Sequence, residues 1–198
     1  MQHNLTKVSL SKDEWDLVNN AQILLTKNEI IKKVYALFGE LAEEYSKAAR
    51  TLPAEVIHKY PKISRGENYE GLPYVMLDYP RHFLKEDTLA IRTFFWWGNF
   101  FSITIQLSGS YREMLLAKFV KAAELNLLND WYVGINEDKW RHDFSEANYA
   151  RQTSSDLKNT MQKAETLKLA KKIPLTEWDG ATYFLESNFK FLLSIIKH

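Results

Sequence analysis

The chain has 198 residues, of which 45% are hydrophobic and 26% charged, a balance typical of a globular protein and unlike that of a disordered one. Its net charge is +1, so its overall electrostatics favours neither nucleic acid nor a membrane surface as a partner. The sequence contains no cysteine, which excludes disulfides, thiolate catalysis and cysteine-bound zinc or iron–sulfur clusters.

The length is that of one domain, and we expect a single domain over residues 1–198. The N-terminal segment has no apolar stretch long enough for a signal peptide, and no apolar run reaches the roughly 18 residues of a membrane span. We therefore expect a cytoplasmic protein with no membrane partner.

Three helix starts are indicated by capping boxes, in which a Ser or Thr is followed three residues later by Glu. They predict helices over 12–20 from Ser11, over 27–51 from Thr26 and over 111–126 from Ser110. The second helix carries apolar residues at three- and four-residue spacing from Ile30 to Leu52, so one of its faces should be buried. Pro53 ends it.

Residues 53–72 follow as a predicted loop, rich in proline and glycine and long for a compact domain. Long ordered loops often carry function. One interpretation is a binding loop that presents Arg65, Glu67 and Tyr69 to a ligand. The other is an irregular connector that covers a sheet edge.

The next segments read as strands. The first spans 73–79 and is ended by Pro80. A hairpin follows, with strands near 90–97 and 100–107 and a two-residue turn at Gly98-Asn99. A single long strand with a bulge at Gly98-Asn99 is the alternative, and the sequence does not decide between them. The hairpin register predicts a core face of Phe94, Trp96, Phe101, Ile103, Ile105 and Leu107, and a second face that includes Phe95, Trp97 and Phe100.

The remaining chain predicts a short strand over 131–135, a charged and mostly helical stretch over 140–172, and a last helix over about 177–197. Helices, a meander of strands, one more strand and helices follow one another in that order. This order predicts an α+β fold whose four-stranded, mainly antiparallel sheet is packed by the long second helix and the C-terminal helix.

Four polar residues lie where the strands begin or end. Asp78, Arg81 and His82 combine a carboxylate, a guanidinium and an imidazole, which together suit proton transfer or the binding of an anion. The simpler interpretation is an ion pair at the strand end beside a solvated histidine. Arg92 shares the parity of the predicted core face, so it needs a partner such as Asp78 or Glu67, unless its side chain extends to water.

Other site types have weak support. Asp138, His142 and Asp143 have roughly metal-ligand spacing, but such groupings are common by chance, and we expect neither a metal site nor a cofactor. The aromatic face resembles a base-stacking platform, yet no run of Lys or Arg interleaves with it, so we expect no nucleic acid. No dinucleotide-binding, P-loop, zinc-protease or α/β-hydrolase motif is present.

Two stretches carry a resemblance: RGENYEGLPYVMLDYPRHF followed by IRTFFWWGNFF, and the earlier SKDEWDLVNNAQILLTKNEII. They resemble uncharacterised conserved bacterial proteins of the Bacteroidetes group, over roughly residues 11–107. The resemblance implies a bacterial, cytoplasmic origin. Since that family has no known function, it assigns a role to no residue.

Three functions are compatible with these features. The first is a small-ligand-binding module, with a pocket between the 53–72 loop, the 78–82 strand end and the aromatic hairpin face. The second is a small enzyme that uses Asp78 or His82 for proton transfer. The third is a protein–protein interaction subunit that presents Phe95, Trp97 and Phe100. The sequence gives neither the ligand nor the oligomeric state.

Overall fold

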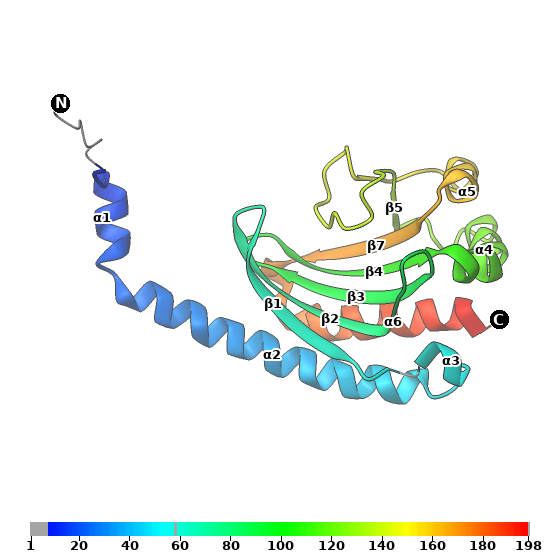
Figure 1. Cartoon of the computed structure of the whole chain (residues 1–198), viewed down its shortest axis with the longest axis horizontal. Helices are drawn as coiled ribbons and strands as arrows, with labels where there is room; N and C mark the ends of the chain where they lie inside the picture. The colour runs from blue at the N-terminus through cyan, green and yellow to red at the C-terminus, as the bar shows by residue number, and fades with distance from the viewer. Residues whose placement is uncertain (1–7, 58, 198) are drawn as a thin grey trace, which may run out of the picture.

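A computed structural model describes residues 8–57 and 59–197. Within them the chain forms an antiparallel sheet of seven strands in the order β1-β2-β3-β4-β7-β5-β6 (Figure 1). The strands are β1 (Lys62–Tyr69), β2 (Leu72–Phe83), β3 (Thr88–Trp96), β4 (Phe100–Ser108), β5 (Tyr132–Gly134), β6 (Tyr149–Ala150) and β7 (Leu167–Pro174). The helices are α1 (Lys12–Val18), α2 (Ala21–Ala49), α3 (Ala54–Ile57), α4 (Gly109–Glu124), α5 (Ser154–Lys163) and α6 (Ala181–Lys197), with a 3-10 helix, η1, at Leu175–Gly180.

The first face of the sheet packs on α2 and α6 (Figure 1). Side chains alternate along a strand, so every second residue faces these helices and forms the main core. Tyr45 of α2 stacks on Phe189 of α6 at 3.6 Å between ring centroids, and its hydroxyl lies 3.0 Å from the hydroxyl of Thr93 on β3. The α+β class and the packing by the long N-terminal and C-terminal helices are therefore as expected.

The second face of the sheet is covered by residues 135–148, the segment between β5 and β6, which we call the strap (Figure 1). Beneath it lies a smaller aromatic cluster built on Phe94, Trp96 and Phe100. Phe144 of the strap packs on Phe100 with ring centroids 5.0 Å apart. The sheet thus has side chains packed on both of its faces.

The expectation of four strands is wrong, because the sheet gains a strand at one edge and further strands at the other. Residues 62–69, predicted as part of a loop, form the edge strand β1. Residues 167–174, predicted mostly as helix, form β7 between β4 and β5. Strand β2 also continues past Pro80 to Phe83, with a register shift between Asp78 and Arg81.

The predicted register of the hairpin is wrong by one residue on one strand. The turn contains three residues, Trp97 to Asn99, and Trp96 pairs with Phe100. The Asn99 amide donates to the Trp96 carbonyl oxygen at 3.0 Å, and Gly98 has a φ of +71°, which favours glycine. Because side chains alternate, this shift moves Phe94 and Trp96 to the second face and puts Phe95 in the main core.

One of the three capping boxes is confirmed. Ser11 accepts a hydrogen bond from the Glu14 amide and caps α1. Helix α2 instead begins at Ala21, six residues before the start that the Thr26 cap predicts. Helix α4 begins after Ser108 rather than after Ser110. The earlier start of α2 lengthens the helix at the end that lies away from the sheet.

Candidate functional site

The polar residues of the second face centre on Arg92. Its Nε and Nη2 donate to the two carboxylate oxygens of Asp78 at 2.7 and 2.9 Å, a bidentate pair between β3 and β2. Its Nη1 lies 2.9 Å from Nε2 of His142, in the strap. Since a guanidinium can only donate, the imidazole nitrogen is the acceptor. Of the alternatives that the sequence leaves open for Arg92, the structure shows the pairing with Asp78.

His142 is suited to this acceptor role because it stays neutral. Burial lowers the pKa of His142 well below its usual value, and the positive charges of Arg92 and Lys168 lower it further. The opposing charge of Asp143 is a smaller influence. The strap therefore meets the sheet through a neutral imidazole.

Two more contacts hold the strap to the sheet. The Tyr69 hydroxyl, at the end of β1, accepts hydrogen bonds from the backbone amides of His142 and Asp143 at 2.7 and 3.1 Å. Lys168 of β7 is 2% exposed, and its Nζ donates to the carbonyl oxygen of Arg141 at 2.6 Å. Burial lowers the pKa of Lys168 to about 8. We call this set of contacts the strap latch.

The polar groups of the strap latch are hydrogen-bonded or ion-paired with one another. Asp78 and Arg92 form a closed pair, and Asp143 is paired with Arg141, whose Nη2 lies 2.9 Å from its Oδ2. In residues 8–57 and 59–197, no group of three or more histidine and carboxylate side chains is arranged to hold a metal. Asp138 accepts a hydrogen bond from the Trp140 amide at 2.9 Å, His142 accepts from Arg92, and Asp143 pairs with Arg141.

The other predicted site residues do not converge. Arg81 donates through Nε to the Tyr60 carbonyl oxygen at 2.7 Å, and His82 packs edge-on against Tyr111 of α4, with ring centroids 4.9 Å apart. Glu67 forms an ion pair with Lys27 of α2.

The three aromatic residues expected on one face are divided between two clusters. Phe95 and Trp97 pack in or against the main core, whereas Phe100 packs under the strap. The predicted pocket between a loop, a strand end and this face is therefore not formed by those residues.

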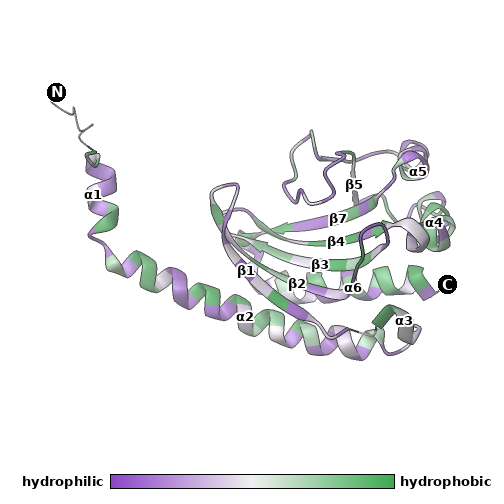
Figure 2. Cartoon of the chain, viewed as in Figure 1, coloured by the Kyte–Doolittle hydropathy of each residue, from purple (hydrophilic) through white to green (hydrophobic). Residues whose placement is uncertain are grey.

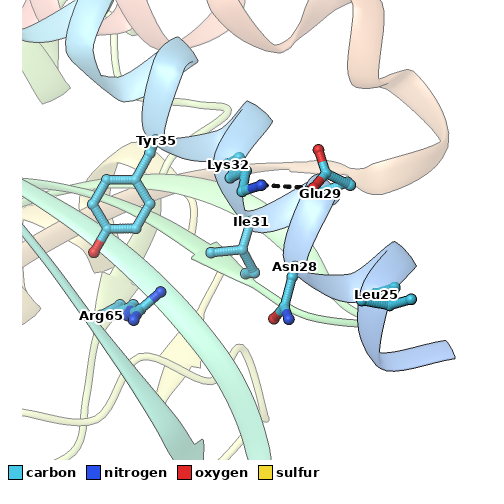
Figure 3. A pocket seen from close by; sticks show the side chains of 7 residues that line it. All are labelled: Leu25, Asn28, Glu29, Ile31, Lys32, Tyr35 and Arg65. Carbon is cyan, nitrogen blue, oxygen red and sulfur yellow. Dashed lines mark hydrogen bonds and ion pairs between the residues drawn. The ribbon is translucent and has the colours of Figure 1, made fainter. Parts of the chain in front are cut away.

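Arg65 lies instead in a groove between α2 and β1, with a volume of about 610 Å³. Figure 3 shows Tyr35, Ile31 and Asn28 of α2 on one side and Arg65 of β1 on the other, with Leu25 at one end. Lys32 also lines it and pairs with Glu29 at 2.7 Å. The groove combines apolar walls with basic groups.

Beyond this groove the chain extends away from the sheet as an arm, residues 8–25, comprising α1 and the first turns of α2 (Figure 1). No residue of α1 is buried. Figure 2 shows hydrophobic residues along both segments. Eight large apolar side chains of the arm are exposed: Val8, Leu10, Trp15, Leu17, Val18, Ile23, Leu24 and Leu25.

The arm continues the apolar stripe of α2. Leu24, Ile31, Phe38 and Tyr45 follow one another at seven-residue spacing, which keeps them on one side of a helix. The last three are buried, whereas Leu24 is 62% exposed. The stripe therefore extends past the sheet with nothing from the described part of this chain covering it. This surface was not predicted from the sequence, although the apolar run Ile23-Leu24-Leu25 before the predicted helix start indicates it.

No family model, curated protein or solved structure matches the chain. The resemblance to a bacterial family and the origin that it implies therefore stay predictions. None of the helices in the described ranges is long and apolar enough to cross a membrane.

Proposed function

We propose that this protein is an interaction subunit that binds another protein chain through its N-terminal arm. The observation that carries the proposal is the uncovered apolar stripe of the arm, from Leu10 to Leu25. Folded proteins rarely expose a large contiguous apolar surface unless a partner covers it. Fully burying one side chain of the size of Leu24 contributes about 1.5–3 kcal/mol, so a few such residues are enough for specific binding.

The interaction surface differs from the one that the sequence suggests. Phe95 is 1% exposed and lies under α2 and α6, so it is not accessible to a partner. Trp15 of the arm is 55% exposed and belongs to a helix with no buried residue. Aromatic residues are common anchors of protein interfaces, and Trp15 can fill that role.

A photo-crosslinking amino acid at position 24 tests the proposal, with the same amino acid at position 40 as control. Glu40 is an exposed residue of the same helix on the part that lies over the sheet. We expect position 24 to crosslink to a protein chain, either a second copy or a different protein, and position 40 to give no specific product. Equal labelling from both positions, or none from position 24, would refute the proposal.

Small-ligand binding is the second candidate, and one cleft favours it. The cleft, of about 410 Å³, opens beside the hairpin and is lined by Trp96, Phe100 and Phe144 together with Lys172. The Lys172 ammonium lies 4.9 Å from the ring centroid of Phe144 and 5.5 Å from that of Phe100. Asp143 also lines the cleft, and its carboxylate is paired with Arg141. The aromatic walls and the Lys172 ammonium suit a flat anionic molecule.

A thermal-shift screen of aromatic carboxylates tests this candidate. A ligand of the cleft should stabilise the wild type and should lose its effect on Lys172→Ala. Equal shifts for both proteins would exclude the cleft. The proton-transfer alternative has less support, because Asp78 is held by Arg92 and His82 packs on Tyr111.

A further inference from the structure

We infer that the partner of the arm is a second copy of this chain, and that two arms pack antiparallel about a two-fold axis near Leu24. This inference rests on the proposed interaction through the arm and names its partner. Three properties of the described residues support it: the charge of each half of the arm, the position of the groove, and the apolar area that the arm exposes.

The two helices near the arm have opposite charges. Helix α1 carries Lys12 against three carboxylates, those of Asp13, Glu14 and Asp16, so its net charge is −2. The first thirteen residues of α2, 21–33, carry three lysines against Glu29, so their net charge is +2. A parallel pair would place α1 beside α1, and like charges would repel. An antiparallel pair places the acidic α1 of each copy beside the basic segment of the other.

The bend of the arm agrees with this pairing. Figure 1 shows α1 turned away from the axis of α2, so that α1 projects beside the first turns of α2 instead of continuing it. The groove residues of α2 begin at Leu25, one residue after the proposed axis, so a two-fold axis near Leu24 places α1 of each copy near the end of the groove in the other copy. In Figure 1, α1 and the sheet lie on the same side of α2, which is the side of β1 and its groove residue Arg65.

The groove has the chemistry that α1 requires. Ile31 and Tyr35 offer apolar contacts to Trp15. Lys32 pairs with Glu29 in the same groove, and Arg65 leaves the groove with a net positive charge that suits the carboxylates of α1. Leu24 would meet its own copy at the axis, and Ile23 would lie opposite Leu25 of the other copy, as a self-complementary interface requires.

The apolar area that the arm exposes is also sufficient for a stable dimer interface. Eight apolar side chains, each exposing roughly 100 Å², provide ~800 Å² per copy, which equals the usual share of one partner in a stable interface.

The first experiment measures the mass of the full chain in solution by sedimentation at about 50 µM. We expect twice the chain mass of 23.2 kDa. Leu24→Glu places a charge at the axis twice and should weaken the dimer by at least ~100-fold, giving a monomer that is still folded by circular dichroism. Leu84→Glu is the matched control: Leu84 is 55% exposed, lies outside the arm and should leave the dimer intact.

A charge exchange tests the antiparallel arrangement. Asp13→Lys with Asp16→Lys should raise the dissociation constant at least tenfold, because α1 then repels the basic segment of the partner. Adding Lys32→Glu and Lys33→Glu to the same chain should restore the dimer. If dimerisation is lost in the first variant and the second pair of changes does not restore it, the antiparallel pairing is wrong.

The failure of this inference can be told from the failure of the proposed function. A wild type that sediments as a monomer, or a Leu24→Glu variant that stays dimeric, overturns the second copy as partner. In the monomer case, a crosslink from position 24 to a different protein would still support an interaction subunit. A monomer whose position 24 crosslinks to no protein overturns both.

Discussion

Acidification below pH 6.5 should destabilise the protein through His142. The histidine accepts a hydrogen bond from Arg92 at 2.9 Å and is 7% exposed, and its pKa is lowered first by burial and then by Arg92 and Lys168. Below pH 6.5 the unfolded chain gains a proton on this side chain, whereas the folded chain does not. The stability that the neutral His142 provides is therefore complete above pH 6.5 and is lost as the pH falls.

The size of the effect follows from linkage. While His142 is protonated only in the unfolded state, the free energy of unfolding falls by about 1.4 kcal/mol for each pH unit. Between pH 6.5 and 5.0 the expected loss is therefore ~2 kcal/mol. The charged groups around His142 are Arg92, Lys168 and Asp143. The pKa of Lys168 is about 8 and the pKa of Asp143 is lowered from its usual value, so these two groups keep their charges in this range.

Urea unfolding followed by tryptophan fluorescence at pH 7.0, 6.0 and 5.0 measures this loss. The matched control is His142→Gln, whose amide oxygen can still accept from Arg92 but does not titrate. His82 is common to both proteins, so its contribution cancels in the comparison. We expect the variant to lose ~2 kcal/mol less than the wild type between pH 6.5 and 5.0. An equal loss in both proteins would refute the neutral His142 and the strap latch built on it.

Three further predictions concern the second face and the start of α4. Asp78→Asn and Arg92→Met should each lower the free energy of unfolding by about 3–5 kcal/mol. The double variant should lose much less stability than the sum of the two single losses. Additive losses in urea unfolding would contradict a closed pair. Wild-type stability should rise between pH 8 and 10 by up to ~3 kcal/mol, because Lys168 loses its proton near pH 8 when folded but near 10.5 when unfolded. Lys168→Met should lack this rise, and a rise of the same size would argue against a buried, shifted lysine. Gly109→Ala should cost about 1–3 kcal/mol in thermal unfolding, since Gly109 has a φ of +56° and a Cβ there would lie 2.2 Å from a carboxylate oxygen. Gly39→Ala, in open space within α2, is its control and should not lower the melting temperature.

The helices that pack on the sheet could be predicted from sequence because their apolar periodicity is long. The stripe of α2 and the C-terminal helix each extend over several turns, and a pattern of that length has few alternative interpretations. Short signals were less reliable. The Ser-x-x-Glu pattern is a true capping box at Ser11, but Thr26 is inside α2. A Ser or Thr followed three residues later by Glu occurs by chance in any charged helix.

Strand β7 was missed because its lysines suggested a solvated helix. Leu167, Leu169 and Ile173 have the alternation of a strand, and they face the main core. Lys168 lies between them on the other face and is buried, since its stem packs under the strap and its ammonium finds the Arg141 carbonyl oxygen. The strap that makes this burial possible is remote in sequence, so the local pattern alone could not reveal it.

In the aromatic hairpin, a shift of one residue in the strand register changes which side chains face the main core. A three-residue turn in place of a two-residue turn keeps both strands but exchanges the faces of Phe94 and Phe95. The candidate binding face of Phe95, Trp97 and Phe100 depended on that register. The pairing of Arg92 with Asp78 did not, because the two lie on neighbouring strands in either register.

The location of function follows from which surfaces the fold leaves uncovered. The first face of the sheet is closed by α2 and α6, and the second is closed by the strap, whose polar contacts are paired within the chain. The contribution of α2 to the first face comes from the part that lies against the sheet, from Ile31 onward. The residues before it add nothing to this core, yet they continue its apolar stripe as a helix into solvent. Helix α1 has seven residues, none of them buried, and isolated helices of that length are marginal in water. Binding through the arm, as we propose, would add the packing that α1 and the first turns of α2 lack within the described part of this chain.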